Sequence, residues 1–412
     1  MNRRKWGVVA ALCLAVVWAL LQNAQAWGLA QSRTYGADFA SYYWAYQAAF
    51  NGLDPYSSEA LTETIRQSGS RAGVHPFFYP PPFLLAMSWV GERTVGQAYR
   101  IWFWVDVAAA VLGAGILALW WRHIRPVWAW LVVFGFLCMG AVANNHAMGQ
   151  VNLPVLAVVL MALWTDDEDA PVAAGILMGL ACMAKMSPAF FVAWWLLRGR
   201  WTSVAVSCLT AIVLSVLSLW IVPVDVQWRF YTEVLPGFGT GDYNGLRVPI
   251  GMWGNHSVPQ WFHSLWPSGG EQLSSTARYA STLFMVSVLG TMGVAFYKRQ
   301  ADAVARAGQV GAVSIAILLV PVYTYEHHLV YAIPGMVAVV GGALMGRLPR
   351  WAIAVSVVAC VFLCVELGTL HEIARHTPGV IHWVLRESKP ASLLVLFFGA
   401  IALGRSQATG ER

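Results

Sequence analysis

The chain has 412 residues, of which 58% are hydrophobic and only 11% are charged, and its mean hydropathy is +0.57. Soluble domains carry roughly 25% charged residues, so this composition excludes an ordinary soluble enzyme and indicates an all-α protein that crosses a membrane many times. The net charge of +6 is modest, and no basic patch with interleaved aromatic residues lies outside the short loops. We therefore expect no nucleic-acid partner.

The cysteines exclude two common kinds of site. All six lie in apolar stretches and none has the Cys-x-x-Cys spacing, so the sequence predicts neither a zinc site nor a disulfide framework. The 22 tryptophans are unusually many, as expected where many helix ends lie at a membrane interface.

The first apolar run, 6–30, is long enough to cross a bilayer and follows the basic group at 3–5. Because basic residues stay on the cytoplasmic side, we expect this span to exit near Ala30. The segment also fits a secretory signal peptide that ends with Ala-Gln-Ala at 24–26, although its core is long for one and continues past that point. Either interpretation leaves the following loop outside.

Loop 31–98 is the first large external segment that we expect. It contains a soluble helix around Glu59–Ser68 and an apolar stretch, Phe83–Val90, that is too short to cross and should lie along or dip into the membrane surface. Later spans are expected at about 99–121, 126–142, 171–184, 203–221 and 279–297, and others end near Thr165, Arg198, Tyr323, Arg347, Glu366 and Arg405. The total is about twelve spans.

Loop charge gives the orientation. Basic turns at 122–125, 198–200, 298–299 and 347–350 mark the cytoplasmic side, and the acidic turn at 166–169 is the exception. We expect both termini inside and a single integral-membrane domain, 1–412. Its external loops 31–98 and 222–275 should cap the bundle on the side where the polar clusters lie.

Asp38 directly follows the first span. It can be an N-cap of a helix over Phe39–Phe50, or a general base whose pKa burial has raised, and the two roles are compatible. Tyr79 precedes three prolines, which predicts either a turn or a rigid wall for a lipid or sugar. Gln150 and Asn152 open a span, where amides serve as helix caps or as ligands of sugar hydroxyls.

Lys185 is the only lysine deep in a hydrophobic stretch, so it either snorkels to the interface or binds a phosphate. Glu326, His327 and His328 lie among apolar spans, where phosphate or sugar binding is favoured over a metal site that lacks further ligands. The sequence Gly-Asn-His-Ser at 254–257 is either a plain turn or part of the same site.

In this order the stretches resemble glycosyltransferase family 87, the polytopic GT-C enzymes that use polyprenyl-phosphate sugars. The matching stretches are Asp38–Phe39, Asn51–Tyr56, Tyr79–Pro81, Gly149–Asn152, Gly175–Pro188, Gly254–Ser257 and Tyr323–His328. His256 departs from the pattern, which has glutamine there, and the departure bears on the sugar contact at that position.

The resemblance implies a hexosyltransferase of GT-C fold in the inner (plasma) membrane. It would move mannose or a related hexose, with inversion, from a lipid-linked donor to a glycolipid or surface-glycan acceptor at the outer face. Asp38 would be the general base, and Lys185 with His327 or His328 would neutralise the donor phosphate. The implied sugar and acceptor contacts are Tyr42, Tyr79, Gln150, Asn152, Asn255 and Glu326.

No cofactor is expected beyond the donor substrate, and no external Asp-x-Asp indicates a metal. Two other classes of function stay open at this point. A transporter or flippase would place ionisable groups near the membrane midplane and would show internal repeats, which the sequence lacks. A non-catalytic subunit of a surface-polysaccharide system would tolerate the loss of Asp38.

Overall fold

The computed structural model describes residues 3–31, 36–69, 76–246, 248–269, 272–298 and 301–406, and within them it contains helices and no strand. The first half forms α1 (Arg3–Gln31), α2 (Ala37–Phe50), α3 (Ser58–Gln67), α4 (Phe83–Ala86), η1 (Ser88–Val90), α5 (Val95–Trp121), α6 (Pro126–Cys138), α7 (Gly140–Met148), α8 (Asn152–Asp167), α9 (Pro171–Ala184), α10 (Ala189–Leu197) and α11 (Trp201–Ser218).

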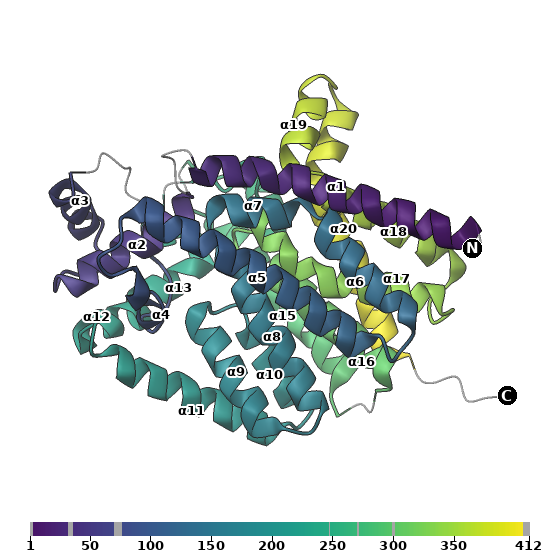
Figure 1. The fold of residues 1–412 in the computed structure, drawn as a ribbon, viewed down its shortest axis with the longest axis horizontal. Coiled ribbons are helices and arrows are strands. Elements are labelled where there is room, and N and C mark those ends of the chain that lie inside the picture. Colours follow the sequence, from purple (N-terminus) through teal and green to yellow (C-terminus); the bar gives the residue numbers. More distant parts are fainter. Residues whose placement is uncertain are drawn as a thin grey trace.

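The second half forms α12 (Val224–Arg229), η2 (Phe230–Val234), α13 (Leu235–Gly237), η3 (Phe238–Thr240), α14 (Val258–Leu265), α15 (Ser275–Phe296), α16 (Ala303–Leu319), η4 (Glu326–Ala332), α17 (Ile333–Leu344), α18 (Arg350–Cys364), α19 (Leu367–Arg375) and α20 (Val380–Arg405). Figure 1 shows the long helices in one bundle, with α2, α3, α4 and α12 grouped at its left end and α19 projecting from it. The all-α prediction is confirmed. Arg299, part of one predicted basic turn, lies outside the described residues.

The number of spans is lower than the sequence suggested. Among the described residues, six helices are long and apolar enough to cross a membrane, or eight if two bent pairs each count once. The bent pairs are α6 with α7, at 49°, and α18 with α19, at 93°. The expected total of about twelve is not confirmed, because some apolar segments are short: α10 has nine residues and reaches only about 14 Å, half of a hydrocarbon core.

The acidic turn at 166–169, which was the exception to the loop-charge pattern, lies at one end of the bundle. Arg200 lies 3.5 Å from Asp166 and 3.6 Å from Asp169, and Arg306 at the start of α16 pairs with Asp167. The acidic turn therefore meets one basic residue from the 198–200 turn and one from the first turn of α16. This places the 166–169 turn and the basic 198–200 turn at the same end, as the span order predicts.

Helix α16 forms the centre of the bundle and is buried along almost its whole length. Glycines allow its backbone to approach its neighbours: a Cβ on Gly308 would lie 2.6 Å from the nitrogen of Gly404, and one on Gly311 would lie 2.9 Å from the Cα of Gly335. Small residues at helix contacts are typical of membrane bundles, in which packing replaces the hydrophobic effect as the cause of association.

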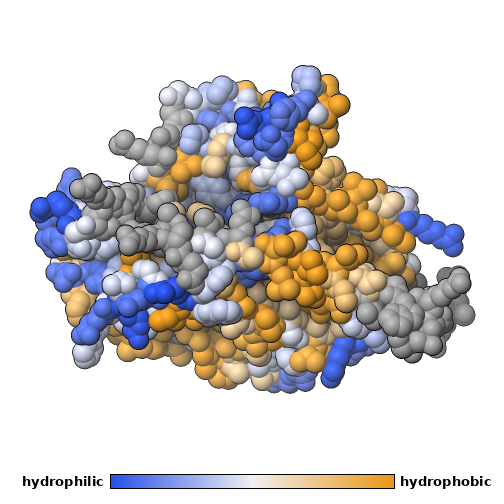
Figure 2. Space-filling model, turned by 45° about the horizontal axis from the view of Figure 1, so that its top comes forward, coloured by the Kyte–Doolittle hydropathy of each residue, from blue (hydrophilic) through white to orange (hydrophobic). Residues whose placement is uncertain are grey.

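The surface divides into an apolar belt and polar ends. Figure 2 shows hydrophobic residues across the middle of the molecule, and hydrophilic residues at the left end and on the projection that contains α19. The stretch Phe83–Val90 belongs to the left end, where α4 and η1 are two short turns with buried Phe83, Leu84 and Val90. Its helix α4 contacts α2 and α9, and the stretch is far too short to span a bilayer.

Candidate functional site

A cavity of about 570 Å³ is lined by residues of the helical bundle and of loops 31–98 and 222–275. Asp38 from the start of α2, Lys185 from the break between α9 and α10, and both His327 and His328 from η4 line it. Residues from three distant parts of the chain thus share one concave surface. The expectation that these side chains line a common cavity is met by the geometry, and their chemical roles stay predictions.

Two glycines bring Asp38 to this cavity. Helix α2 begins at Ala37 with Gly36 as its N-cap, so the interpretation of Asp38 as the N-cap is wrong and the carboxylate lies in the first turn. A Cβ on Gly36 would lie 2.3 Å from the carbonyl oxygen of Met148. Gly149 ends α7 in the left-handed conformation, with φ of 65°, and a Cβ there would lie 2.6 Å from the Cβ of Phe39. Only glycine permits this contact between α2 and α7.

Tyr79 and Gln150 form the wall beside Asp38. The Tyr79 hydroxyl donates to Gln150 Oε1 at 3.1 Å, and Tyr42, fully buried behind them, donates to the same oxygen at 2.9 Å. Burial raises the pKa of Tyr42 and of Tyr79, so both stay protonated donors at physiological pH. The predicted sugar ligands Tyr79 and Gln150 therefore line the cavity, whereas Tyr42 supports them from behind.

Lys185 extends its ammonium group between an amide and an aromatic face. Its Nζ donates to Asn152 Oδ1 at 2.6 Å and lies 5.7 Å from the centroid of the Tyr79 ring. Asn152 in turn donates to the backbone oxygen of His327 at 3.1 Å. Burial lowers the pKa of Lys185 to about 7, and the negative charge of Asp38 opposes this shift. Asn152, predicted as a sugar ligand, instead links Lys185 to η4.

The two histidines differ in their hydrogen bonds. The backbone N–H of Tyr325 donates to His328 Nδ1 at 3.1 Å, so neutral His328 carries its proton on Nε2. His327 is buried, and its Nε2 has no hydrogen-bond partner among the described residues. Both imidazoles therefore keep an uncommitted ring nitrogen at a cavity that also contains Lys185. This arrangement suits the binding of an anionic group.

Glu326 was predicted to bind sugar, and its carboxylate already has two partners within the protein. Lys389 Nζ contacts Oε1 at 2.5 Å, and His256 Nε2 lies 3.1 Å from Oε2. All three side chains are at least 96% buried. His256, which stands where the family pattern has glutamine, thus contacts Glu326. Lys389 was not predicted, and the structure places it inside α20, where it pairs with Glu326.

Asn255 does not line the cavity, and this corrects its prediction as a sugar ligand. Its side-chain nitrogen donates to the backbone oxygens of Ile250 and Val322, and its oxygen accepts from the N–H groups of Ser257 and Thr324. Every hydrogen-bonding position of the amide is engaged with backbone. Asn255 therefore fastens the 250–257 loop to the segment that leads into η4.

The Asn51–Tyr56 motif stabilises the outer wall of the site. Asp54 accepts from the N–H of Tyr56 at 2.8 Å and forms an ion pair with Arg229 from α12. The Tyr56 hydroxyl donates to the backbone oxygen of Tyr79 at 2.7 Å. The motif thus joins both large external loops to the residue that faces Lys185, which explains why it occurs near the site without lining it.

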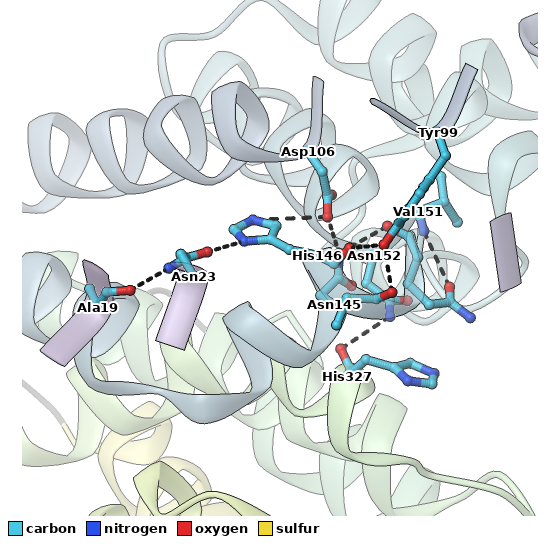
Figure 3. A network of polar contacts seen from close by, with 11 residues as sticks. Ala19, Asn23, Tyr99, Asp106, Asn145, His146, Val151, Asn152 and His327 are labelled. Atoms are coloured by element: carbon cyan, nitrogen blue, oxygen red, sulfur yellow. Dashed lines mark hydrogen bonds and ion pairs between the residues drawn. The ribbon is translucent and has the colours of Figure 1, made fainter. Parts of the chain in front are cut away.

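A second polar network supports the site from the opposite side of α7 (Figure 3). Asn145 donates to Asp106 Oδ2 at 2.7 Å and to the backbone oxygen of Gln150 at 2.9 Å. The His146 ring contacts Asn23 of α1 at 2.5 Å. Asp106 is completely buried and was not predicted, although a lone aspartate inside a long apolar helix is the same kind of signal that singled out Lys185. Its network fixes the Gly149–Gln150 turn.

The helices and the cavity define a membrane-embedded helical protein with acidic and basic groups gathered at one cavity. The sequence model of Glycosyltransferase family 87 matches residues 77–321, which is more than half of the chain. The chain belongs to Glycosyltransferase family 87. The matched segment contains Tyr79, Gln150 and Lys185, whereas Asp38 and His328 lie outside it.

Three curated relatives have related names. The chain is 25% identical over 280 residues to a polyprenol-phosphate-mannose-dependent alpha-(1-2)-phosphatidylinositol pentamannoside mannosyltransferase of Mycolicibacterium smegmatis, across 65% of this chain and 62% of the relative. It is also similar to two polyprenol-phosphate-mannose-dependent alpha-(1-2)-phosphatidylinositol mannoside mannosyltransferases. The one of Mycobacterium tuberculosis is 25% identical, across 53% of this chain and 55% of the relative. The one of Mycolicibacterium smegmatis is 28% identical, across 51% of this chain and 48% of the relative. The chain thus spans about half to three fifths of the length of these relatives.

Proposed function

We propose that this protein transfers a hexose, with mannose as the first candidate, from a polyprenyl-phosphate sugar to a hydroxyl of a glycolipid or surface-glycan acceptor. The observation that carries the proposal is the shared cavity, in which one carboxylate, Asp38, faces a group of nitrogen donors: Lys185, His327 and His328. The names of the three relatives support a polyprenol-phosphate-mannose donor and a phosphatidylinositol mannoside type of acceptor.

The proposed reaction is a single displacement with inversion at the sugar's anomeric carbon. Asp38 accepts the proton of the acceptor hydroxyl while the new C–O bond forms, and the bond from the anomeric carbon to the phosphate oxygen breaks. The leaving group is polyprenyl phosphate, whose growing negative charge Lys185 and the two histidines stabilise. Because protonated Lys185 supplies positive charge and the two neutral imidazoles can supply hydrogen bonds, we propose that the transfer needs no metal ion and continues in EDTA.

The sugar itself would contact Tyr79 and Gln150, both of which line the cavity, and Glu326 would contact it from η4. Tyr42 and Asn152 would keep these residues and Lys185 in place through the hydrogen bonds described above. We propose that the protein lies in the plasma membrane, the inner membrane of a cell that has two, with this cavity at the outer face.

The test is turnover in liposomes with synthetic polyprenyl-phosphate mannose, glucose and N-acetylglucosamine. Asp38→Asn keeps the shape of the side chain but cannot accept the proton, so transfer should fall by about 10²–10⁴-fold. The matched control is Asp242→Asn, which removes a carboxylate from the outer loop and should leave the rate unchanged. Near-native turnover by purified Asp38→Asn protein would refute the base, and lipid translocation without any sugar product would support a flippase.

A further inference from the structure

The cavity extends beyond Asp38 along a set of five aromatic rings that the proposed reaction does not use. These rings, which we call the aromatic ladder, all line the cavity and come from three segments outside the membrane-spanning helices: Phe78, Phe238, Tyr243, Tyr323 and Tyr325. They belong to both large external loops and to the link between α16 and η4. The ladder is thus built from the outer layer of the molecule.

The rings contact one another in sequence. Phe238 stacks on Tyr243 with centroids 4.4 Å apart, Tyr243 meets the edge of Tyr323 at 5.2 Å, and Tyr323 stacks on Tyr325 at 5.5 Å. Phe78 packs edge-on against the first two rings. Tyr325 then lies 5.8 Å from the rings of both His327 and His328. The ladder therefore leads from the outer loops to the proposed reaction centre.

Another part of the lining of the same cavity has a different chemistry. Phe190, Met285 and Ile317 come from α10, α15 and α16 and are apolar. That lining suits a hydrocarbon chain. The ladder instead combines flat ring faces with hydroxyl edges, and the Tyr325 hydroxyl is buried without a hydrogen-bond partner among the described residues. A sugar hydroxyl bound in the cavity would satisfy that hydroxyl.

We infer that the aromatic ladder binds the acceptor glycan, with the terminal sugar beside Asp38 and further sugar units along Tyr323 and Tyr243. One face of a hexopyranose presents C–H bonds polarised by the ring oxygens, and it matches the negative face of an aromatic ring. Sugar hydroxyls at the edge of that face can bond to tyrosine. The inference rests on the proposed function and names the half of the cavity that takes the acceptor.

The first test separates acceptor from donor in steady-state kinetics. Tyr243→Leu keeps an apolar side chain but removes the ring face, so the acceptor KM should rise roughly fivefold to tenfold with the donor KM unchanged. Tyr243→Phe keeps the ring face and should raise the acceptor KM less than Tyr243→Leu does. The matched control is Trp228→Leu, a 69% exposed aromatic in the same external loop that does not line the cavity. A Tyr243→Leu enzyme with an unchanged acceptor KM, or a raised donor KM instead, would overturn the inference.

A second test does not depend on turnover. Octyl α-mannobioside is titrated against Asp38→Asn protein in lipid nanodiscs, and contacts are read by saturation-transfer NMR. If Tyr243→Leu weakens the binding, the ladder is supported. It is supported even if the protein never transfers a sugar from a donor, and only the proposed function then fails. Binding that is absent, or that Tyr243→Leu leaves unchanged, overturns the ladder as the glycan site.

Discussion

The ammonium group of Lys185 is buried in the cavity and is surrounded by several polar groups. Asp38, Tyr79, His327 and His328 surround the same part of the cavity. Burial lowers the pKa of Lys185 to about 7, so in the empty cavity the charged form is fully present only below that pH. A phosphate group would favour the charged form again, because an ion pair is stronger where water is excluded.

Replacing Lys185 with methionine should impair donor use far more than acceptor use. Methionine retains an apolar stem, so the break between α9 and α10 should persist while the charge is lost. We expect kcat/KM for the donor to fall by roughly 10²-fold, the usual effect of removing a donor that stabilises a transition-state anion. Donor and acceptor are varied separately in the assay. Unchanged donor kinetics would mean that the histidines carry the phosphate without Lys185.

The pH profile gives an independent readout of the same residue. As the pH rises through about 7, Lys185 loses its proton, so kcat/KM for the donor should decline on the alkaline side. Lys185→Arg keeps its charge throughout this range, and we expect it to be partly active with that decline removed. A Lys185→Arg enzyme with the same alkaline decline as the wild type would assign the decline to another group.

At single positions, the sequence predicted which charged residues belong to the site better than it predicted which residues they contact. Asp38 and Lys185 could be assigned to one side because loop charge orients the spans and a lone charge in an apolar stretch is costly. The roles of Asn255 and Glu326 could not be read in this way. Their partners, the backbone at 322–324 and Lys389 in α20, are distant in the chain, and only the fold brings them together.

At the scale of elements, the site depends on how closely α2 can approach the end of α7. Gly149 combines a left-handed φ of 65° with a contact in which a Cβ would lie 2.6 Å from Phe39 and 2.8 Å from the Tyr99 ring. The Gly149–Asn152 stretch stood out in the sequence, but the lack of room for a side chain at Gly149 did not. No local pattern indicates that another helix will pack on a glycine.

Gly149→Ala should therefore destabilise the protein and reduce transfer. The left-handed conformation alone costs about 1–2 kcal/mol for a residue with a Cβ, and overpacking adds about 1–3 kcal/mol. Gly199→Ala is the matched control, since Gly199 has a φ of 72° with only one atom, 3.9 Å away, near the added Cβ. The unfolding temperature in detergent should be highest for the wild type, lower for Gly199→Ala and lowest for Gly149→Ala. Equal unfolding temperatures for the two variants would show that the close packing around Gly149 adds nothing to the loss of stability.

The ion pair between Glu326 and Lys389 connects η4 to α20 inside the bundle. Removing one partner leaves a buried charge, so Lys389→Met should lower stability by about 3–5 kcal/mol. The double variant Glu326→Gln with Lys389→Met removes both charges and should recover most of that loss. Unfolding temperature and size-exclusion profiles measure both effects. A double variant no more stable than Lys389→Met would show that the pair is not coupled.

The double variant also decides what Glu326 does. If it folds and transfers sugar at the native rate, Glu326 serves only to hold η4, and its proposed sugar contact is wrong. If it folds but has a raised KM for the sugar-bearing substrates, the cavity-lining carboxylate has a binding role beyond its ion pair.

On the scale of the whole molecule, the sequence predicted the all-helical class and the order of apolar segments. It could not predict which segments are full spans, because hydropathy does not report where a helix breaks. The segments α9 and α10 were predicted as two spans, yet they are helices of only 14 and nine residues, with Lys185 in the break between them. The acidic turn at 166–169 was weak evidence for orientation, and its pairing with Arg200 and Arg306 supplies the missing support.

The last prediction concerns which end of the bundle faces outward. Basic turns stay in the cytoplasm, so the end that carries Arg200, Arg306 and the acidic turn should be inside, and α3 and α19 should be outside. In a variant whose native cysteines are replaced by alanine, Thr62→Cys and Glu372→Cys should react with a membrane-impermeant maleimide on intact cells. Glu168→Cys and Arg350→Cys should react only after permeabilisation. All four positions are exposed, so access to reagent depends on the membrane alone. Labelling of Glu168→Cys on intact cells would invert the orientation and move the proposed reaction to the cytoplasmic face.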